Sequence, residues 1–173
     1  MKIDQNTDIL KLESYLKNSV EKTVSVLRDK KLTLGFAESC TGGLLSSCFT
    51  AIAGVSDVFL GSVVSYDNKV KQKFLKVSAE TLKNFGAVSS EVANQMAEEA
   101  VKAFEVSIAV SITGVAGPSG GTPQKPVGTV FIALAGSRSE AKVFEHHFDG
   151  NRKQIQLQSC VEAVKHLNEF INS

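Results

Sequence analysis

The feature that most constrains the fold is the apolar run VSIAVSIT at residues 106–113. A short run that is apolar almost throughout is typical of a strand buried on both faces of a sheet, as in α/β proteins. Helical patterns lie at both ends of the chain, because residues 8–30 and 152–171 each carry an apolar stripe at helical spacing. Strands that alternate with helices predict a three-layer α/β/α sandwich.

Further segments have the composition of strands, and two of them lie close together near the end of the chain. The four segments are residues 31–38, 58–66, 129–135 and 141–148. Because only a few residues separate the last two, we expect a hairpin in which one strand runs antiparallel. The sheet should be mixed but mostly parallel, with about five or six strands. The chain has 173 residues, of which 43% are hydrophobic, so we expect one domain over residues 1–173.

Composition excludes several classes of function. The chain has 19 Lys and Arg against 18 Asp and Glu, and its net charge of +1 is too near zero for non-specific nucleic-acid binding. No apolar run approaches the roughly 20 residues that cross a bilayer, so we expect no membrane partner. The three cysteines are an odd number without metal-binding spacing, and residues 1–8 lack an apolar signal segment. These features favour a cytoplasmic protein.

The first candidate for chemistry is the segment AESCTGG at residues 37–43, between a predicted strand and a predicted helix. Here Ser39 can point into the crevice at the carboxyl edge of the sheet, while the backbone N–H groups that follow hold an oxyanion. Two other interpretations stay open on these residues alone. Ser39 or Thr41 can simply cap the helix, and Cys40 is a rival nucleophile because a helix N-terminus lowers a thiol pKa.

The second candidate is the segment YDNKVK at residues 66–71, at the end of a predicted strand. A lysine that is desolvated there can be neutral and serve as a general base for a serine. Most lysines in such a run are solvated, so we expect at most one of Lys69, Lys71 and Lys73 to be catalytic. Tyr66 is either a half-buried core aromatic or a hydrogen-bond donor to a substrate.

A third candidate is the loop at residues 114–128, which contains every proline of the chain and several glycines. Its backbone donors suit a phosphate or a carboxamide, although a purely structural turn has the same composition. Arg152 begins the last helix, where an anion can meet both the guanidinium and the positive end of the dipole, although these residues alone favour an ordinary surface arginine. We expect no metal, because His146 and His147 are adjacent on a strand and point to opposite faces.

Taken together, these segments resemble the CinA carboxy-terminal domain family, whose stand-alone members hydrolyse nicotinamide mononucleotide. The likeness covers nearly the whole chain. It implies a three-layer α/β/α domain, conversion of nicotinamide mononucleotide to nicotinate mononucleotide and ammonia, no metal or other cofactor, and an oligomer. The segments that carry it are AESCTGG at 37–43, GSVVSY at 61–66 with Asn68 and Lys71, and ITGVAGP at 112–118 continuing to VGTV at 127–130.

The resemblance also implies roles for individual residues. Ser39 becomes the nucleophile, Lys71 its base, and Tyr66 and Thr113 polar organisers of the site. Arg152 becomes the anchor for the substrate phosphate. The other substrate-binding residues that the resemblance implies are Cys40, Thr41, Gly42, Gly43, Gly114 and Gly117.

Three positions depart from the family pattern, which often has Glu at Lys69, Asp at Asn151 and a second Arg at Gln156. The first change adds positive charge near the proposed base, and the other two thin out the ionic network around Arg152. Two rival functions fit the same motifs: a non-catalytic nucleotide-binding or interaction module, and a hydrolase of a different small amide. Release of ammonia from nicotinamide mononucleotide, and not from nicotinamide or glutamine, separates the three.

Overall fold

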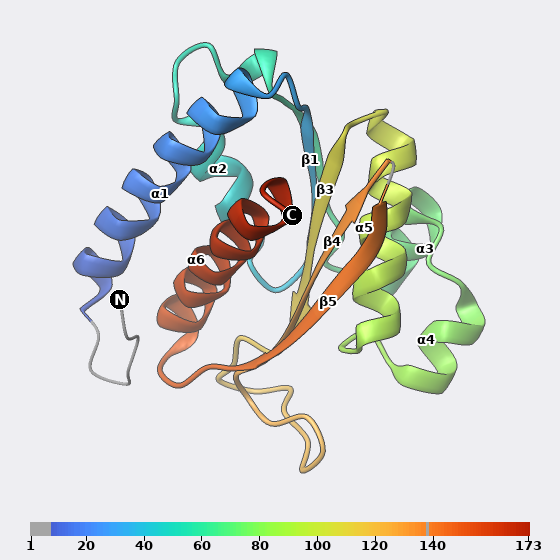
Figure 1. The fold of residues 1–173 in the computed structure, drawn as a ribbon. Coiled ribbons are helices and arrows are strands. Elements are labelled where there is room, and N and C mark those ends of the chain that lie inside the picture. The colour runs from blue at the N-terminus through green and yellow to red at the C-terminus, as the bar shows by residue number, and fades with distance from the viewer. Residues whose placement is uncertain (1–7, 138) are drawn as a thin grey trace.

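The computed structural model describes residues 8–137 and 139–173, and it contains a five-stranded sheet between two layers of helices (Figure 1). This arrangement confirms the predicted α/β/α sandwich. The strands are β1 (Leu34–Glu38), β2 (Phe59–Val64), β3 (Ile108–Gly114), β4 (Thr129–Gly136) and β5 (Ser139–His147). The helices are α1 (Ile9–Asp29), α2 (Leu44–Thr50), α3 (Asn68–Leu75), α4 (Ala79–Phe85), α5 (Ser90–Phe104) and α6 (Arg152–Ile171), with a short 3-10 helix, η1 (Val55–Asp57).

The strands lie in the order β2-β1-β3-β4-β5. β1 pairs in parallel with both β2 and β3, while β4 is antiparallel to both of its neighbours. Four strands of the described sheet therefore run in one direction and β4 in the other, which confirms the mixed, mostly parallel sheet. The connection from β4 to β5 is the predicted hairpin, and it is tight enough for Gly136 to pair with Ser139.

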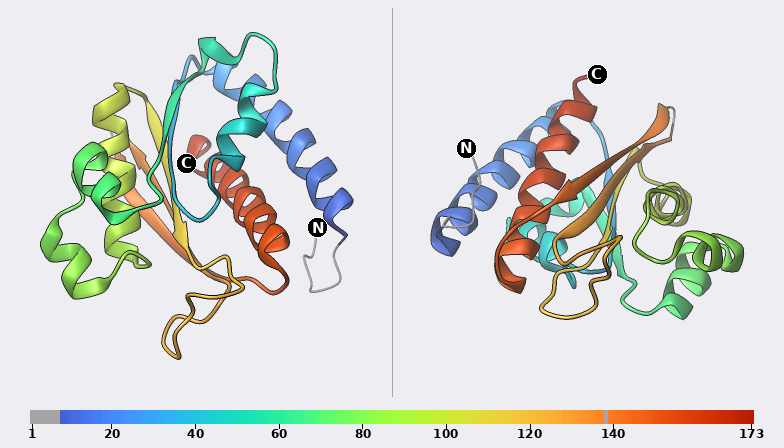
Figure 2. Two further views of the ribbon diagram at one scale, coloured as in Figure 1. Left: turned by 180° about the vertical axis from the view of Figure 1, so that it is seen from behind. Right: turned by 90° about the horizontal axis from the view of Figure 1, so that it is seen from below.

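Helices α1, α2 and α6 cover one face of the sheet, and α3, α4 and α5 cover the other (Figure 2). The strands divide their side chains accordingly. In β3, Ile108, Val110 and Ile112 belong to the larger core under α1 and α6, whereas Ala109 packs on the α5 side. The apolar run from which the fold was predicted is thus buried on both faces, as that pattern requires.

Small residues let α5 lie close against its face of the sheet. Ala93, Ala97 and Ala100 of this helix are fully buried. Gly35 of β1 has no room for a side chain, since an added Cβ would lie 2.6 Å from the ring of Phe104. Close packing at this position therefore depends on glycine, because protein cores are packed near crystal density.

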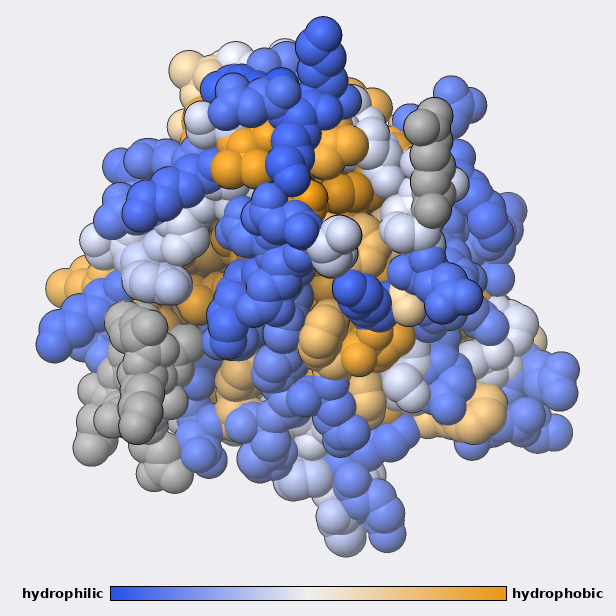
Figure 3. All heavy atoms as spheres, in the orientation of Figure 1, coloured by the Kyte–Doolittle hydropathy of each residue, from blue (hydrophilic) through white to orange (hydrophobic). Residues whose placement is uncertain are grey.

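The first strand begins three residues later than predicted. Lys31 has a φ of 53° and its N–H donates to the carbonyl of Arg28, so residues 31 and 32 close α1. The carbonyl of Thr33 already accepts the N–H of Ile108, just before β1 begins at Leu34. Figure 3 shows hydrophilic residues over most of the face seen in Figure 1, with apolar residues in patches between them.

Within residues 8–137 and 139–173, none of the helices has the length and apolar character to span a bilayer. Residues 1–7, on which the expectation about a signal segment rests, lie outside the described part of the chain.

Candidate active site

The candidate site lies at the carboxyl ends of β1 and β3, where the chain changes direction across the sheet. From β1 the chain passes through α2 to β2 on one side, and it then returns through α3, α4 and α5 to β3 on the other. Such a change leaves a crevice beyond the strand ends, where open α/β sheets bind their ligands. A cleft of about 250 Å³ lies there, and both Ser39 and Gly114 line it.

Ser39 and Lys71 meet in this cleft. Ser39 directly follows β1, and its N–H donates to the carbonyl of Ile112 in β3, which fixes its backbone. Lys71 lies on α3, and its Nζ is 2.9 Å from the Oγ of Ser39 and also donates to the carbonyl of Ser65. Both side chains are buried, with Ser39 8% and Lys71 1% exposed. The structure thus brings together a hydroxyl and an amine that are 32 residues apart in the sequence.

The amine of Lys71 binds a proton less tightly than the amine of an exposed lysine does. Burial lowers its pKa from the ordinary 10.5 to about 8, because an ammonium loses hydration inside the protein. Cys40 and Asp67 act in the opposite direction and are outweighed. At pH 7 roughly a tenth of the amine is then neutral. In that form Nζ has a lone pair that can accept the Ser39 proton, while an N–H continues to donate to Ser65.

Cys40 is not activated as a nucleophile. Burial raises the pKa of its thiol to about 12, although Lys71 and Arg152 each lower it in part. The side chain is 5% exposed and belongs to the main apolar core. A thiol attacks as the thiolate, so this environment favours Ser39 over its neighbour.

The carboxylate of Glu38 organises the turn that carries Ser39, a role that the sequence analysis did not assign. Glu38 is fully buried, and its two oxygens accept hydrogen bonds from the Thr41 hydroxyl and from the N–H groups of Gly43, Leu45 and Ser46. The hydroxyl of Ser46 donates to it as well. Since the N-cap of α2 is a glycine without a side chain, this carboxylate takes the place of a cap. The sequence feature that indicates this role is that Glu38 is a single charged residue at the end of an otherwise apolar strand.

The same hydrogen bonds show what part of the turn does within the fold. Thr41, Gly42 and Gly43, to which the family resemblance gives a role in substrate binding, are not among the residues that line the cleft. The N–H of Gly43 donates to Glu38, and that of Gly42 donates to the carbonyl of Ser39. Their left-handed φ values of 65° and 95° show that the glycines serve the turn itself. Among residues 40–43, Cys40 lines the cleft, so its backbone amide is the one placed to meet a ligand there.

Arg152 reaches the cleft from the start of α6. Its Nη1 donates to the carbonyl of Gly117 at 2.7 Å, and its Nη2 donates to the hydroxyl of Tyr66 at 2.9 Å. A guanidinium has five N–H donors, so three remain for an anion. The residue before it, Asn151, forms a capping box with Gln154, which sets where the helix and its positive end begin.

Thr113 and Gly114 close the floor of the cleft. The Thr113 hydroxyl donates to the carbonyl of Ala87, so it ties the end of β3 to the loop before α5. Gly114 admits no side chain, since an added Cβ would lie 2.6 Å from the carbonyl oxygen of Thr129. Asn68 of the second candidate segment and Val115, Ala116, Ser119 and Gly120 of the loop at 114–128 also line the cleft. The sequence analysis did not anticipate two further lining residues, Ala87 and Val88.

A larger hollow of about 590 Å³ lies between α1 and α2 and has a different character. Apolar side chains such as Leu16, Leu44 and Ile52 form much of its wall. Burial raises the pKa of its cysteine, Cys48, so that thiol is also held protonated. The smaller cleft is the better candidate because a buried hydroxyl and a buried amine of lowered pKa lie within hydrogen-bonding distance there.

Comparison with known proteins identifies relatives along nearly the whole chain. A family model described as the CinA C-terminal domain matches residues 16–171. A CinA-like protein of Thermotoga maritima is 46% identical over 151 residues, which are 87% of this chain and 36% of that protein. A CinA-like protein of Leptospira interrogans is 50% identical over 136 residues, 79% of this chain and 32% of the relative. The chain thus spans about a third of the length of these relatives.

Solved structures of related proteins match this chain over nearly their full length. The crystal structure of competence/damage inducible protein CihA from Agrobacterium tumefaciens has a TM-score of 0.88 and 36% identity, and it covers 92% of this chain and 96% of its own. A competence-damaged protein (CinA) superfamily protein from Escherichia coli has a TM-score of 0.81 and 29% identity, with 98% and 95% covered. The fold therefore recurs in proteins whose length is close to that of this chain.

The hydrogen bonds of Glu38 lead to a prediction about the nucleophile turn. Glu38→Gln keeps the shape of the side chain but replaces one acceptor oxygen with an NH₂ group that faces backbone donors. We expect the free energy of unfolding to fall by about 2 kcal/mol or more, as measured by urea denaturation. The exposed Glu145→Gln is the control, and equal midpoints in urea for the two variants would contradict the role of Glu38.

Proposed function

Because this chain belongs to the CinA C-terminal domain family, we propose that it is a serine amidohydrolase that converts nicotinamide mononucleotide to nicotinate mononucleotide and ammonia. The observation that carries the proposal is the buried contact of 2.9 Å between Lys71 and Ser39 in a cleft. A nucleophile with an adjacent base of lowered pKa is the arrangement that covalent amide hydrolysis requires. The substrate itself is inferred from the family resemblance of the motifs.

The first half of the reaction forms an ester and releases ammonia. Neutral Lys71 takes the proton from Ser39 as Oγ bonds to the carboxamide carbon. The carbonyl oxygen gains the negative charge, and the amide of Cys40, a residue that lines the cleft, is the donor that we assign to it. Lys71 then passes its proton to the amide nitrogen, the carbon–nitrogen bond breaks, and ammonia leaves. The positively charged pyridinium ring of the substrate assists the attack by withdrawing electrons.

The second half restores the enzyme. Lys71 takes a proton from a water molecule as its oxygen attacks the ester carbon, and the proton is returned to Ser39 when the carbon–oxygen bond breaks. The product is a pyridine carboxylic acid, which loses its proton to solvent. The same amine thus acts as base and acid in each half, and its pKa near 8 suits both directions.

Arg152 is the group that we assign to the phosphate. It lines the cleft, and its bonds to Gly117 and Tyr66 hold the guanidinium in place while leaving donors free. The described residues that line the cleft include neither histidine nor a carboxylate, so Ser39 and Lys71 supply the proton transfers.

The direct test is ammonia release by the purified chain. We expect release from nicotinamide mononucleotide and not from nicotinamide or glutamine. Binding of the mononucleotide without any ammonia would instead indicate a non-catalytic nucleotide-binding module. Release from the other amides at comparable rates would indicate a less selective hydrolase.

The nucleophile is tested by paired substitutions. Ser39→Ala should lower kcat by roughly 10⁴-fold or more and leave the circular dichroism spectrum unchanged, because the attacking oxygen is lost. Cys40→Ala removes a protonated thiol, and we expect it to keep kcat within about tenfold of the wild type. The reverse ranking of the two variants would assign the covalent step to Cys40.

The base is tested through pH. If Lys71 accepts the proton, kcat/KM should fall on the acid side of about pH 8, and Lys71→Met should abolish turnover while substrate binding stays measurable. The exposed Lys69→Met, on the same helix, is the control and should keep the wild-type profile. Turnover by Lys71→Met at near the wild-type rate would show that another group takes the proton.

The dependence of the stability on pH should report the same lowered pKa of Lys71. Between about pH 8 and 10.5 the unfolded chain binds a proton at Lys71 while the folded chain does not. The stability of the wild type therefore decreases as pH falls through this interval and loses nothing further below it. The difference amounts to about 3 kcal/mol. Lys71→Met should show a flatter dependence over this interval in urea denaturation, whereas Lys69→Met should not.

Arg152 makes a different prediction, about affinity. Hydrogen bonds to the phosphate form about equally in the ground state and the transition state, so Arg152→Ala should raise KM by about tenfold or more with little change in kcat. The preference for nicotinamide mononucleotide over nicotinamide riboside should shrink in parallel. Lys153→Ala, at the next position of the helix and paired with Glu13, is the control. A collapse of kcat at constant KM would place Arg152 at the reacting amide instead.

A further inference from the structure

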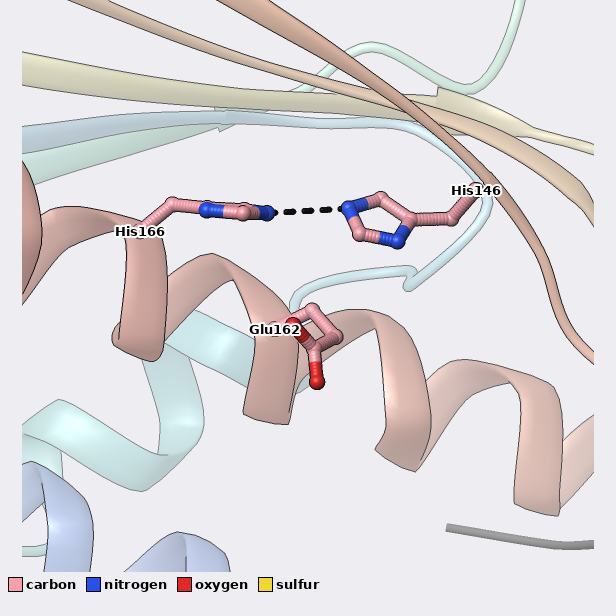
Figure 4. A group of neighbouring side chains, drawn as sticks. All are labelled: His146, Glu162 and His166. Atoms are coloured by element: carbon pink, nitrogen blue, oxygen red, sulfur yellow. Dashed lines mark hydrogen bonds between the residues drawn. The ribbon is translucent and has the colours of Figure 1, made fainter. Parts of the chain in front are cut away.

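A second group of polar side chains lies between β5 and α6 (Figure 4). His146 comes from β5, and Glu162 and His166 are four residues apart on α6, so they share one face of the helix. The Nε2 atoms of the two imidazoles face each other at 3.0 Å. One ligand atom of each residue lies within 4.8 Å of the other two. The sequence analysis considered His146 only together with His147 and did not anticipate the side chains of α6.

We propose that His146, Glu162 and His166 bind a divalent transition-metal ion, with Zn²⁺ as the ion that the ligands suit. Two imidazoles and one carboxylate form a ligand set of zinc sites that keep a fourth position open for water or another molecule. Two nitrogens at 2.0–2.1 Å from a tetrahedral zinc ion are about 3.3 Å apart. The observed separation of 3.0 Å is close to this value, and the two nitrogens now share a hydrogen bond, so both rings must turn for their lone pairs to face the ion.

Aromatic neighbours hold both imidazoles in this orientation. The ring of His166 stacks on Phe144 with centroids 3.7 Å apart and an angle of 7° between the planes. The ring of His146 stacks on Phe148 at 5.1 Å and 8°. Side chains whose positions are already restricted lose less conformational entropy when they bind an ion.

The outer partner of His166 favours metal ligation. Its Nδ1 lies 3.3 Å from a carboxylate oxygen of Glu169. When Nδ1–H donates to that carboxylate, the lone pair is left on Nε2, which is the atom aimed at His146. A carboxylate that fixes the tautomer of a histidine in this way is a regular feature of metal sites.

Glu162 must move as well. Its carboxylate now accepts a hydrogen bond from Lys165 at 3.0 Å, three residues along the helix. Lys165 is largely exposed, and ion pairs of this kind contribute little. Turning Glu162 toward the imidazoles therefore costs little. The positive charge of Lys165 opposes a cation at this point, whereas Glu162 and Glu169 favour one.

The site is accessible and separate from the proposed active site. β5 is an edge strand, and both His146 and Glu162 are partly exposed. None of the three ligands lines the cleft that contains Ser39. An ion here would join β5 to α6 and would stabilise the folded chain by mass action. The inference goes beyond the proposed hydrolase activity and does not depend on it.

The test is a titration with zinc of the untagged chain after removal of metals with EDTA. We expect one Zn²⁺ per chain by native mass spectrometry and isothermal calorimetry, and a rise in Tm with zinc concentration. Co²⁺ bound in its place should give visible absorption bands without the near-ultraviolet band of a thiolate ligand, which separates this site from the three cysteines.

Paired variants assign the ligands. His146→Asn and Glu162→Gln should each weaken zinc binding by about tenfold or more, whereas the neighbouring His147→Asn and Glu145→Gln should bind as the wild type does. Glu162→Gln lies outside the hydrogen-bonded pair of imidazoles, so it decides the matter if His146→Asn does not fold. The absence of zinc binding by the wild type, or binding that is unchanged in Glu162→Gln, would overturn the proposal. Because the readout is binding and not turnover, this failure is distinct from a failure of the proposed hydrolase activity.

Discussion

Burial of a single amine beside a hydroxyl is the constraint on which the rest of the site depends. Lys71 can act as a base near neutral pH only while it is shielded from water, and folding must supply the energy that keeps it there. The packing of α3 against α5 and the hydrogen bond to Ser65 provide this shielding. The lowered pKa and the proposed chemistry therefore have one cause, and any change that lets water reach the amine removes both.

A second buried charge positions Ser39, the hydroxyl partner of the Lys71 amine. The carboxylate of Glu38 accepts five hydrogen bonds from the start of α2 and the turn before it, so its desolvation is offset by donors that are otherwise without partners. Ser39 is the next residue, and its own N–H is held by β3. A nucleophile that is fixed on both sides needs no rearrangement before it attacks. The cost is that the glycine amides of this turn cannot also bind an oxyanion.

The order of strands and helices could be predicted because it depends on local pattern. The two segments alone left open whether Lys69, Lys71 or Lys73 serves Ser39, and the choice of Lys71 came from the family resemblance. The direction of individual side chains could not be predicted. Nothing in the sequence shows that Glu38 bends back to the following helix, or that His146 meets His166. Those contacts depend on how α6 lies against β5, which is a property of the packed core and not of either segment.

The three departures from the family pattern are compatible with an intact site. Lys69 is exposed on α3, and burial, not this neighbouring charge, is the main cause of the lowered pKa of Lys71. Asn151 still caps α6 and so preserves the position of Arg152. Gln156 donates from its side-chain amide to the carbonyl of Cys40 at 2.9 Å, and it thereby tethers the nucleophile turn to the helix that carries the proposed phosphate anchor. The neutral amide of Gln156 thus joins this turn to α6 by a hydrogen bond, at a position where the family often has the charged side chain of arginine.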